Sequence, residues 1–584
     1  MRPIPSSLIF VILLIAGTAA AQWTEVPLRN TGFEAWTDGV ADGWELLTAI
    51  DPDGCTHDCT LAASDDAHDG DRALLLAGDG ETCRWTGLVQ SFTDFTAGQV
   101  YRLSGWMKTT GVDPAGRRHA NCQFFAIPQA ENGQRLGYYG VPLVGGTTDW
   151  TRYSVIFPVN AGVADYQLGA FLSVPGMALF DDLRLERLET PTVSTGADRH
   201  ERWRADIAYT ALIIRTLHPD PWAHITAEDF QARIDALTAA IDDLDDATLT
   251  WRLRAAVCSL QDSHTSTDVP AGVLAKLPVS LYWFDDGIHV VAVAAGHEAL
   301  LGARLTAIDG RPLAKILAGL RPQIACTSEG WFHEQAVGWL AMPGALHGLG
   351  LCDEATALTL GAVDDEGYEI SERVALLGVD AEPEFEVAGP PEDQQPLYRR
   401  RDRLYWFTYL PESRTLYMKY DSCREDPERP LKTFGAELVA ALDANPVDRF
   451  VLDVRHNAGG SNLINGLFRE LGRRVADGRI GQTFVITGRR TYSAAVYDAD
   501  AMRQRTAAVV VGEPTGMAPV HPGQVASFKL PGSGLELSCS TKMIQASQDT
   551  SPALMPDIET TLTWDDFLAG RDPALAAVLA YEKK

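Results

Sequence analysis

The chain has 584 residues, of which 46% are hydrophobic and 22% are charged. These values are typical of globular proteins and exclude a fibrous or largely disordered chain. Lys and Arg number 49 against 78 Asp and Glu, which gives a formal net charge of −29. Because such an acidic surface repels phosphate backbones, we expect no nucleic-acid partner. At about 100–200 residues per domain, the length predicts several domains.

The first 21 residues have the layout of a secretory signal. Arg2 precedes an apolar run from Leu8 to Ala16, and small residues end at Ala21. This run is shorter than the roughly 20 apolar residues that a membrane span needs. We expect a signal peptide over 1–21, no transmembrane segment, and export to the periplasm or the extracellular space. Export permits disulfides, but nine cysteines are an odd number, so at least one lacks a partner within the chain.

Residues 22–190 have the pattern of an all-β domain. Apolar residues alternate in runs such as 101–106 and 153–157, between clusters of Gly, Asp, Asn and Pro. The opening segment 30–34 and the closing segment 180–185 resemble the jelly-roll, carbohydrate-binding-type modules of secreted enzymes. This resemblance implies a β-sandwich over 22–190 and a carbohydrate ligand.

Two features of this domain have a plain and a functional interpretation. Trp44, Trp106 and Trp150 are expected in the core, because aromatic side chains bury large areas, and the alternative is a sugar-binding platform. The acidic stretch 65–71 is expected to be a solvated loop, and the alternative is a calcium site.

A polar linker at 189–196 precedes a helical segment over 197–270. One predicted helix stops at His218-Pro219. A second begins at Thr226, with Asp229 three residues later in the manner of a capping box. Its apolar face continues to Leu244. A third helix runs to Leu260 and leads into the turn Asp262-Ser263-His264-Thr265.

Strands return over 271–395, with a hairpin predicted at Asp286-Gly287. Residues 301–313 resemble the second half of a PDZ-like peptide-binding module. Residues 396–584 alternate strands, such as 450–454, 483–486 and 508–512, with helices, one of which has its apolar face at Leu463, Leu467, Leu471 and Val475. This alternation predicts a largely parallel sheet whose turns hold the functional site.

Ser493 is placed where a strand leads into a helix, so the free N–H groups of the helix start can stabilise an oxyanion there. An ordinary N-cap serine favours the same position. Gly459 and Gly460 follow another strand and let the backbone approach a ligand.

Motifs in a fixed order carry a family resemblance. D-x-R-x-N-x-G-G at 453–460, T-x-S-A-A at 491–495 and V-G-E-P-T-G at 511–516 occur together. With the helical lead-in ending in L-x-D-S-H-T, they resemble the tail-specific, C-terminal-processing and tricorn-core serine peptidases. The resemblance implies a crotonase/ClpP-like α/β catalytic domain over 396–584 and a peptide or protein substrate. It implies Ser493 as nucleophile, with the amides of Ala494 and of Gly459 or Gly460 as the oxyanion hole.

The family divides over the base that activates the serine. One branch uses a lysine, and its position here is Ala518; the next lysine, Lys529, is expected in a strand. The tricorn-like branch uses a histidine, which His264 matches, and Ser263 would support the site. The pKa of imidazole near 6.5 suits this role. The branch also implies a late acid, for which Asp549 is nearest and Glu513 competes.

We therefore expect an exported Ser/His peptidase that needs no metal and no organic cofactor. The alternatives are a Ser/Lys tail-specific protease, a non-catalytic ligand-binding protein on the same fold, and a protein acting mainly on polysaccharide. The last would require two facing carboxylates, which no segment suggests.

Overall fold

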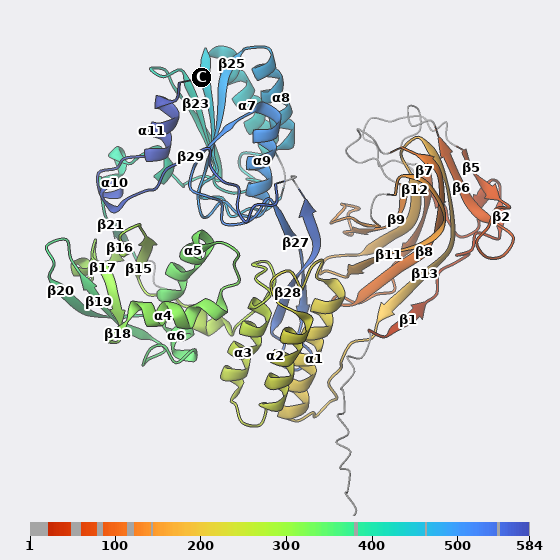
Figure 1. The fold of residues 1–584 in the computed structure, drawn as a ribbon, viewed down its shortest axis with the longest axis horizontal. Helices are drawn as coiled ribbons and strands as arrows, with labels where there is room; N and C mark the ends of the chain where they lie inside the picture. Colours follow the sequence, from red (N-terminus) through yellow and green to blue (C-terminus); the bar gives the residue numbers. More distant parts are fainter. Residues whose placement is uncertain are drawn as a thin grey trace, which may run out of the picture. The chain divides into compact units, whose positions relative to one another are not determined.

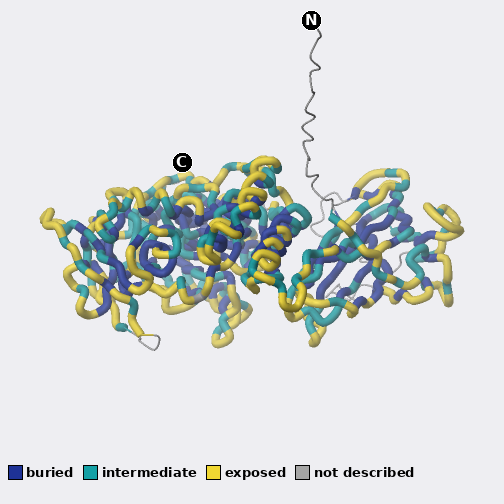
Figure 2. The backbone as a smooth tube through the Cα atoms, turned by 90° about the horizontal axis from the view of Figure 1, so that it is seen from below, coloured by how far each residue is buried: buried dark blue, intermediate teal, exposed yellow. Residues whose placement is uncertain are grey.

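The computed structural model describes residues 21–47, 60–78, 86–113, 122–141, 144–378, 383–461, 464–545 and 549–582. Nearly all of the expected signal peptide lies outside these ranges, as do Cys55, Cys59 and Cys83. The chain divides into two compact units, Met1–Thr190 and Pro191–Lys584. In each unit the buried residues are gathered in the interior and the exposed residues lie at the surface (Figure 2). Among the described residues no helix is long and apolar enough to cross a membrane.

The N-terminal unit consists of two antiparallel sheets that pack on one core (Figure 1). The first contains β1 (Trp23–Val26), β5 (Thr60–Ser64), β6 (Ala73–Gly78), β8 (Val100–Val112), β11 (Gly146–Pro158) and β13 (Gly176–Leu188). The second contains β4 (Glu45–Leu46), β7 (Thr86–Phe92), β9 (Cys122–Gln129), β10 (Tyr139–Gly140) and β12 (Asp165–Leu172). A small hairpin joins β2 (Trp36–Thr37) and β3 (Val40–Ala41). The core includes Leu103 of β8 and Phe124 of β9, so side chains of both sheets meet in it.

The three tryptophans do not share one environment. Trp44 is buried in the core, but Trp106 and Trp150 are only half-buried, so the expectation of a core position is wrong for these two. The cause is the pleat of β8: Leu103 and Met107 face the core, so Trp106 faces outward. There the ring of His68 stacks on Trp106 at 3.8 Å.

The acidic stretch is held by contacts within the protein. Asp66 forms an ion pair of 2.8 Å with Lys108, and the buried carboxylate of Asp181 accepts the N–H groups of His68 and Asp69. No cluster of three metal-ligating side chains occurs in the part of the chain that the structure describes.

The C-terminal unit begins with three helices, α1 (Arg199–Leu217), α2 (Ala227–Ala239) and α3 (Asp246–Cys258). The predicted cap of α2 is confirmed, since the Thr226 hydroxyl accepts the N–H of Asp229 at 3.0 Å. The stop of α1 at His218 is also confirmed. The helix α2 ends before Leu244, and Ile241 is buried in the turn that follows.

The turn after α3 is joined to a hairpin from the end of the chain. Strand β14 (Ser266–Thr267) pairs with β28 (Glu536–Gln545), which pairs with β27 (Val520–Lys529). These three strands form a separate small sheet beside the helices (Figure 1). The pairing fixes residues 262–265 against a segment more than 250 positions away in sequence.

The middle of this unit is a seven-stranded antiparallel sheet with three helices inserted in it. Its predicted hairpin at Asp286-Gly287 is confirmed. The strands are β15 (Val279–Trp283), β16 (Ile288–Ala294), β17 (Arg304–Ile308), β18 (Arg311–Pro312), β19 (Ala357–Val363), β20 (Glu369–Ala375) and β21 (Phe385–Val387), and the helices are α4 (Leu313–Leu320), α5 (Glu329–Leu340) and α6 (Pro343–Gly348). Single 3₁₀ turns lie at Ala271–Leu274, Glu298–Leu300, Arg321–Gln323, Glu392–Gln394 and Leu397–Arg399.

The last part is a six-stranded sheet that is parallel except for its edge strand β22. Its strands are β22 (Tyr405–Leu410), β23 (Thr415–Tyr420), β24 (Val447–Asp453), β25 (Ile480–Thr487), β26 (Val509–Gly512) and β29 (Ile558–Glu559). Helices α7 (Leu431–Ala444), α8 (Asn465–Ala476) and α9 (Ala494–Thr506) cover one face and α11 (Pro573–Ala580) the other, with α10 (Trp564–Leu568) nearby (Figure 1). The predicted alternation of strand and helix is confirmed, although Leu463 lies outside the described residues.

Candidate active site

Ser493 stands at the N-terminus of α9 in an unusual backbone conformation. Its φ is 52° and its ψ is −123°, a combination that favours glycine. An ordinary N-cap serine has an extended backbone, and its hydroxyl accepts an N–H of the first helical turn. The Ser493 hydroxyl makes no such capping bond. Instead, its Oγ lies 3.1 Å from Nε2 of His264.

His264 is held in the tautomer that can accept a proton from Ser493. Its Nδ1 lies 3.0 Å from the carbonyl oxygen of Pro522, at the start of β27. A carbonyl oxygen only accepts, so Nδ1 carries the hydrogen and Nε2 presents its lone pair to the Ser493 hydroxyl. Burial lowers the pKa of His264 below 6.5, although the charge of Asp262 and the Pro522 carbonyl act in the opposite direction.

The carboxylate nearest to this histidine is that of Asp262. Its Oδ1 accepts the backbone N–H of His264 at 3.0 Å and lies 4.0 Å from Nδ1 of the ring. Its Oδ2 accepts hydrogen bonds from His218 at 3.0 Å and from the hydroxyls of Thr265 and Ser540 at 2.5 and 2.6 Å. Burial alone would raise the pKa of Asp262, but these bonds outweigh it and hold the pKa below its usual value.

The expectation that Asp549 assists His264 is therefore corrected. Asp549 lies in the loop after β28, where its carboxylate accepts the N–H of Ser551 at 2.9 Å. The contacts of the His264 ring run instead to Ser493, Pro522 and Asp262. The competitor Glu513 forms an ion pair of 3.2 Å with Arg489. Asp262 belongs to the D-S-H-T motif, but its role depends on a turn that the sequence pattern does not specify.

Ser263 lies beside the pair and bonds to the residue before the nucleophile. The Tyr492 hydroxyl donates to Ser263 Oγ at 2.7 Å, and the Tyr492 ring stacks on Trp331 of α5 with 4.0 Å between centroids. The Tyr492 and His264 rings lie 4.9 Å apart. Ser263 thus links the turn that carries the histidine to the loop that carries the serine.

The amide of Ala494 and that of Gly459 or Gly460 were expected to form the oxyanion hole, and the structure distinguishes the two glycines. Gly459 has a φ of 96°, and a Cβ there would lie 2.8 Å from the Cβ of Ser493, so only glycine fits this close approach. Its N–H donates to the side chain of Asn457 at 2.8 Å and is therefore engaged. The N–H groups of Gly460 and Ala494 have no acceptor within the described residues, and remain available to a ligand.

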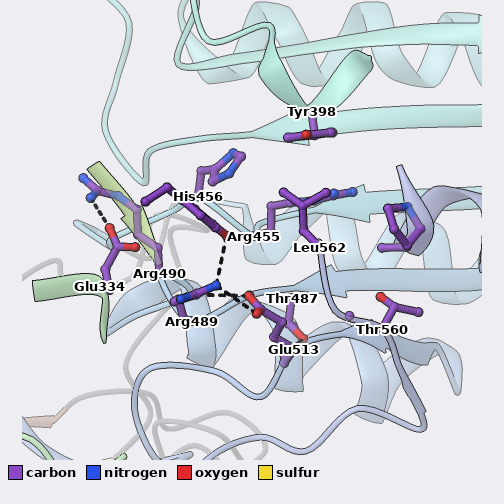
Figure 3. Close-up of a pocket in the computed structure, with 15 residues that line it drawn as sticks. Glu334, Tyr398, Arg455, His456, Thr487, Arg489, Arg490, Glu513, Thr560 and Leu562 are labelled. Carbon is purple, nitrogen blue, oxygen red and sulfur yellow. Dashed lines mark hydrogen bonds and ion pairs between the residues drawn. The ribbon is translucent and has the colours of Figure 1, made fainter. Parts of the chain in front are cut away.

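Two arginines hold the loop that leads into Ser493 (Figure 3). Arg489 donates to the carbonyl oxygen of Trp283 at 2.7 Å and to the Tyr282 hydroxyl at 3.2 Å. It also forms an ion pair with Glu513 (Figure 3). Arg490 forms an ion pair of 2.6 Å with Glu334 of α5. The antiparallel region thus braces the nucleophile loop. No local sequence signal predicts the contacts with Trp283, Tyr282 and Glu334, which lie more than 150 residues away.

The D-x-R motif at 453–455 forms a buried ion network. Asp453 pairs with Arg455 at 2.9 Å and with Lys419 at 3.3 Å, and Arg455 also pairs with Asp572. Burial would raise the pKa of Asp453, but the charges of Arg455 and Lys419 hold it well below its usual value. The motif therefore fixes the turn at the end of β24, which carries Gly459 and Gly460.

The lysine alternative finds no support in this geometry. Lys529 is the last residue of β27, as expected of a strand residue, and is exposed. Lys419 is fully buried between Asp421 and Asp453. Among the described residues, the side chain that bonds to Ser493 Oγ is His264.

Comparisons with known proteins add likenesses of fold. No protein-family model and no curated protein matches the chain. Mature CPAF complexed with lactacystin is similar at 13% identity and a TM-score of 0.49, over 65% of this chain and 98% of that one. The photosystem II D1 C-terminal processing protease is similar at 12% identity and a TM-score of 0.33, over 64% and 98%. The CBM22-1 xylan-binding domain of Paenibacillus barcinonensis Xyn10C is similar at 20% identity and a TM-score of 0.21, over 27% and 93%. At TM-scores below 0.5 these likenesses carry no functional assignment by themselves.

Proposed function

We propose that this chain is a serine peptidase that cleaves peptide bonds through an acyl-enzyme. The observation that carries the proposal is the bond of 3.1 Å between Ser493 Oγ and His264 Nε2, at a helix start with two unengaged amides. A nucleophile, a base in the accepting tautomer and oxyanion donors are the groups that acyl transfer requires.

In this mechanism His264 takes the proton of Ser493 while Oγ attacks the substrate carbonyl carbon. The amides of Gly460 and Ala494 would stabilise the oxyanion that forms. His264 then gives its proton to the leaving nitrogen as the C–N bond breaks, and water hydrolyses the acyl-enzyme. Asp262 fixes the turn of His264 and favours the imidazolium through its charge. The cycle needs no metal or organic cofactor.

The test combines active-site labelling with peptide digestion. A fluorophosphonate probe should label the wild type at Ser493 and should not label Ser493→Ala or His264→Ala. A peptide library read by mass spectrometry should be cut by the wild type and by Lys529→Ala, and by neither active-site variant. A Lys529→Ala protein without activity, beside an active His264→Ala protein, would establish the Ser/Lys mechanism instead. Absence of both labelling and cleavage in the wild type would favour the non-catalytic ligand-binding alternative.

For the N-terminal unit we propose a jelly-roll topology with a carbohydrate ligand. The half-buried position of Trp150 supports this proposal, because sugar rings stack on partly exposed aromatic side chains. Retardation of the wild type in gels containing soluble polysaccharides, and its loss in Trp150→Ala, would test it. We also propose export, on the signal-like composition of residues 1–21.

A further inference from the structure

A cavity of about 340 Å³ lies beside the proposed catalytic histidine. Ser263, which precedes His264, is on its wall, and so are His521 and Pro522 of β27. Pro522 is the residue whose carbonyl oxygen holds Nδ1 of His264, and the ring of His521 lies 5.8 Å from that of His264. The cavity therefore adjoins the turn and the strand that hold the imidazole, although the His264 ring is not itself on its wall.

The wall of this cavity is mainly hydrocarbon. Met517, Val520, Met543 and Pro552 contribute apolar side chains from the ends of the hairpin. Such a lining favours an apolar side chain, because its transfer from water is favourable in proportion to the area buried.

The buried ionisable groups of the wall, His218, Asp262 and His521, are already paired. The carboxylate of Asp262 is bonded to His218. Nδ1 of His521 donates to the carbonyl oxygen of Ala518 at 2.7 Å, and burial lowers the pKa of His521 to about 4, so that ring is neutral. The carboxylate of Asp220 stands at the exposed rim, where it repels acidic side chains. No lysine or arginine is among the described residues that line the cavity, so an acidic ligand finds no permanent cation there.

The position of the cavity identifies the part of the substrate that enters it. In acyl transfer the histidine donates its proton to the departing nitrogen, so the leaving segment lies against the imidazole. The acyl segment lies toward the oxyanion donors. The cavity is bordered by the histidine turn and β27, whereas Gly459, Gly460 and Ala494 are not among its lining residues.

We infer that this cavity binds an apolar side chain on the first residue of the leaving peptide, the P1′ residue. The inference rests on the proposed function and adds a substrate class to it. As His264 Nε2–H passes its proton to the amine and the C–N bond breaks, the released amine is the one whose side chain occupies the cavity. The wild type should accordingly cleave peptides with Leu, Met or Phe at P1′ about 10-fold or more faster, in kcat/KM, than peptides with Gly or Asp there.

A pair of variants on one strand tests the site. Met543 lines the cavity, and its neighbour Lys542 is exposed and does not line it, since successive strand residues face opposite ways. Met543→Trp should lower kcat/KM for P1′ Leu peptides about 10-fold or more and leave P1′ Gly peptides nearly unchanged. Lys542→Trp should change neither. Esters with the same acyl part and a methanol leaving group have no P1′ side chain, so both variants should hydrolyse them like the wild type.

An experiment on the unaltered protein supplies a second measurement. The acyl-enzyme formed from an ester partitions between water and an added amino-acid amide, which must enter the leaving-group side. Leucinamide should capture the acyl group about 10-fold better than glycinamide. Equal capture by the two amides would overturn the inference. It would also be overturned if the decrease in kcat/KM caused by Met543→Trp depended on the P1 residue of the peptide and not on the P1′ residue. If ester hydrolysis does not depend on Ser493, the proposed function itself fails, and that result is distinct from either outcome.

Discussion

Burial of the His264 ring sets the pH range in which the proposed base can work. Its side chain is 13% exposed, and burial lowers its pKa below 6.5. Only the neutral imidazole accepts the Ser493 proton, so activity is lost as pH falls through this lowered pKa. We expect the acidic limb of kcat/KM to have its midpoint below pH 6.5. A series of rate measurements from pH 4 to 8 checks this, and a midpoint above 7 would contradict a buried histidine base.

Removing the charge of Asp262 should act on both rate and titration. Its negative charge stabilises the imidazolium, so Asp262→Asn lowers the pKa of His264 further and moves the acidic limb to lower pH. The asparagine amide also has one acceptor oxygen in place of two, so it cannot accept all the hydrogen bonds that the Asp262 carboxylate accepts. We expect kcat to fall about 10²–10⁴-fold, as for other groups that orient a catalytic imidazole. A merely structural role would lower the rate without moving the limb.

Asp549→Asn is the matched control for this charge removal. Its carboxylate accepts the N–H of Ser551 in the loop after β28. Both kcat and the acidic limb should therefore stay close to those of the wild type. A shift of the acidic limb of the pH–rate profile in Asp549→Asn would show that Asp549, and not Asp262 alone, assists His264.

At the scale of elements, helix α9 carries an acid that opposes folding at neutral pH. Asp498 is buried, its Oδ1 has no hydrogen-bond partner within the described residues, and burial raises its pKa to about 8. The folded state thus keeps a proton that the unfolded state releases above about pH 4. The contribution of Asp498 to the free energy of unfolding therefore falls as pH rises from about 4 to 8, by up to about 1.4 kcal/mol per pH unit.

Asp498→Asn should remove this dependence, since an amide has the shape of the protonated acid and does not titrate. We expect the variant to exceed the wild type in free energy of unfolding by more at pH 8 than at pH 5. Urea denaturation at the two pH values measures the difference. An equal difference at both would show that Asp498 is ionised in the folded protein.

The elements that the sequence predicted are those with local causes. The cap of α2 depends on Thr226 and Asp229, and the hairpin at Asp286-Gly287 on its own turn residues. Ser493 and His264 could be chosen by motif, and the structure brings them together. Asp262 could not be assigned, because its position follows from the pairing of β14 with β28, which joins distant segments. The bracing of Arg489 by Trp283 is non-local in the same way.

At the scale of the whole molecule, the division at Thr190 predicts that the catalytic unit folds alone. Every residue assigned to chemistry lies in the compact unit Pro191–Lys584. A chain beginning at Thr192 should be soluble and should keep the wild-type kcat on short peptides. Losses should be confined to large or surface-bound substrates, where a second binding site acts through effective concentration. Circular dichroism and steady-state assays check this, and a folded but inactive chain would place the N-terminal unit in the catalytic architecture.

The backbone conformation of Ser493 also affects the thermal stability of the protein. A serine held at a φ of 52° and a ψ of −123° raises the free energy of the native state by about 1–3 kcal/mol. This backbone strain is present with and without bound substrate. Ser493→Gly should relieve this backbone strain, whereas Ser493→Ala should retain it, although both variants lack the nucleophile. We therefore expect the glycine variant to melt at a higher temperature than the alanine variant in calorimetry. Ser493→Gly would then give a protein that is inactive but thermally more stable. Serine is therefore retained at this position for catalysis and against stability.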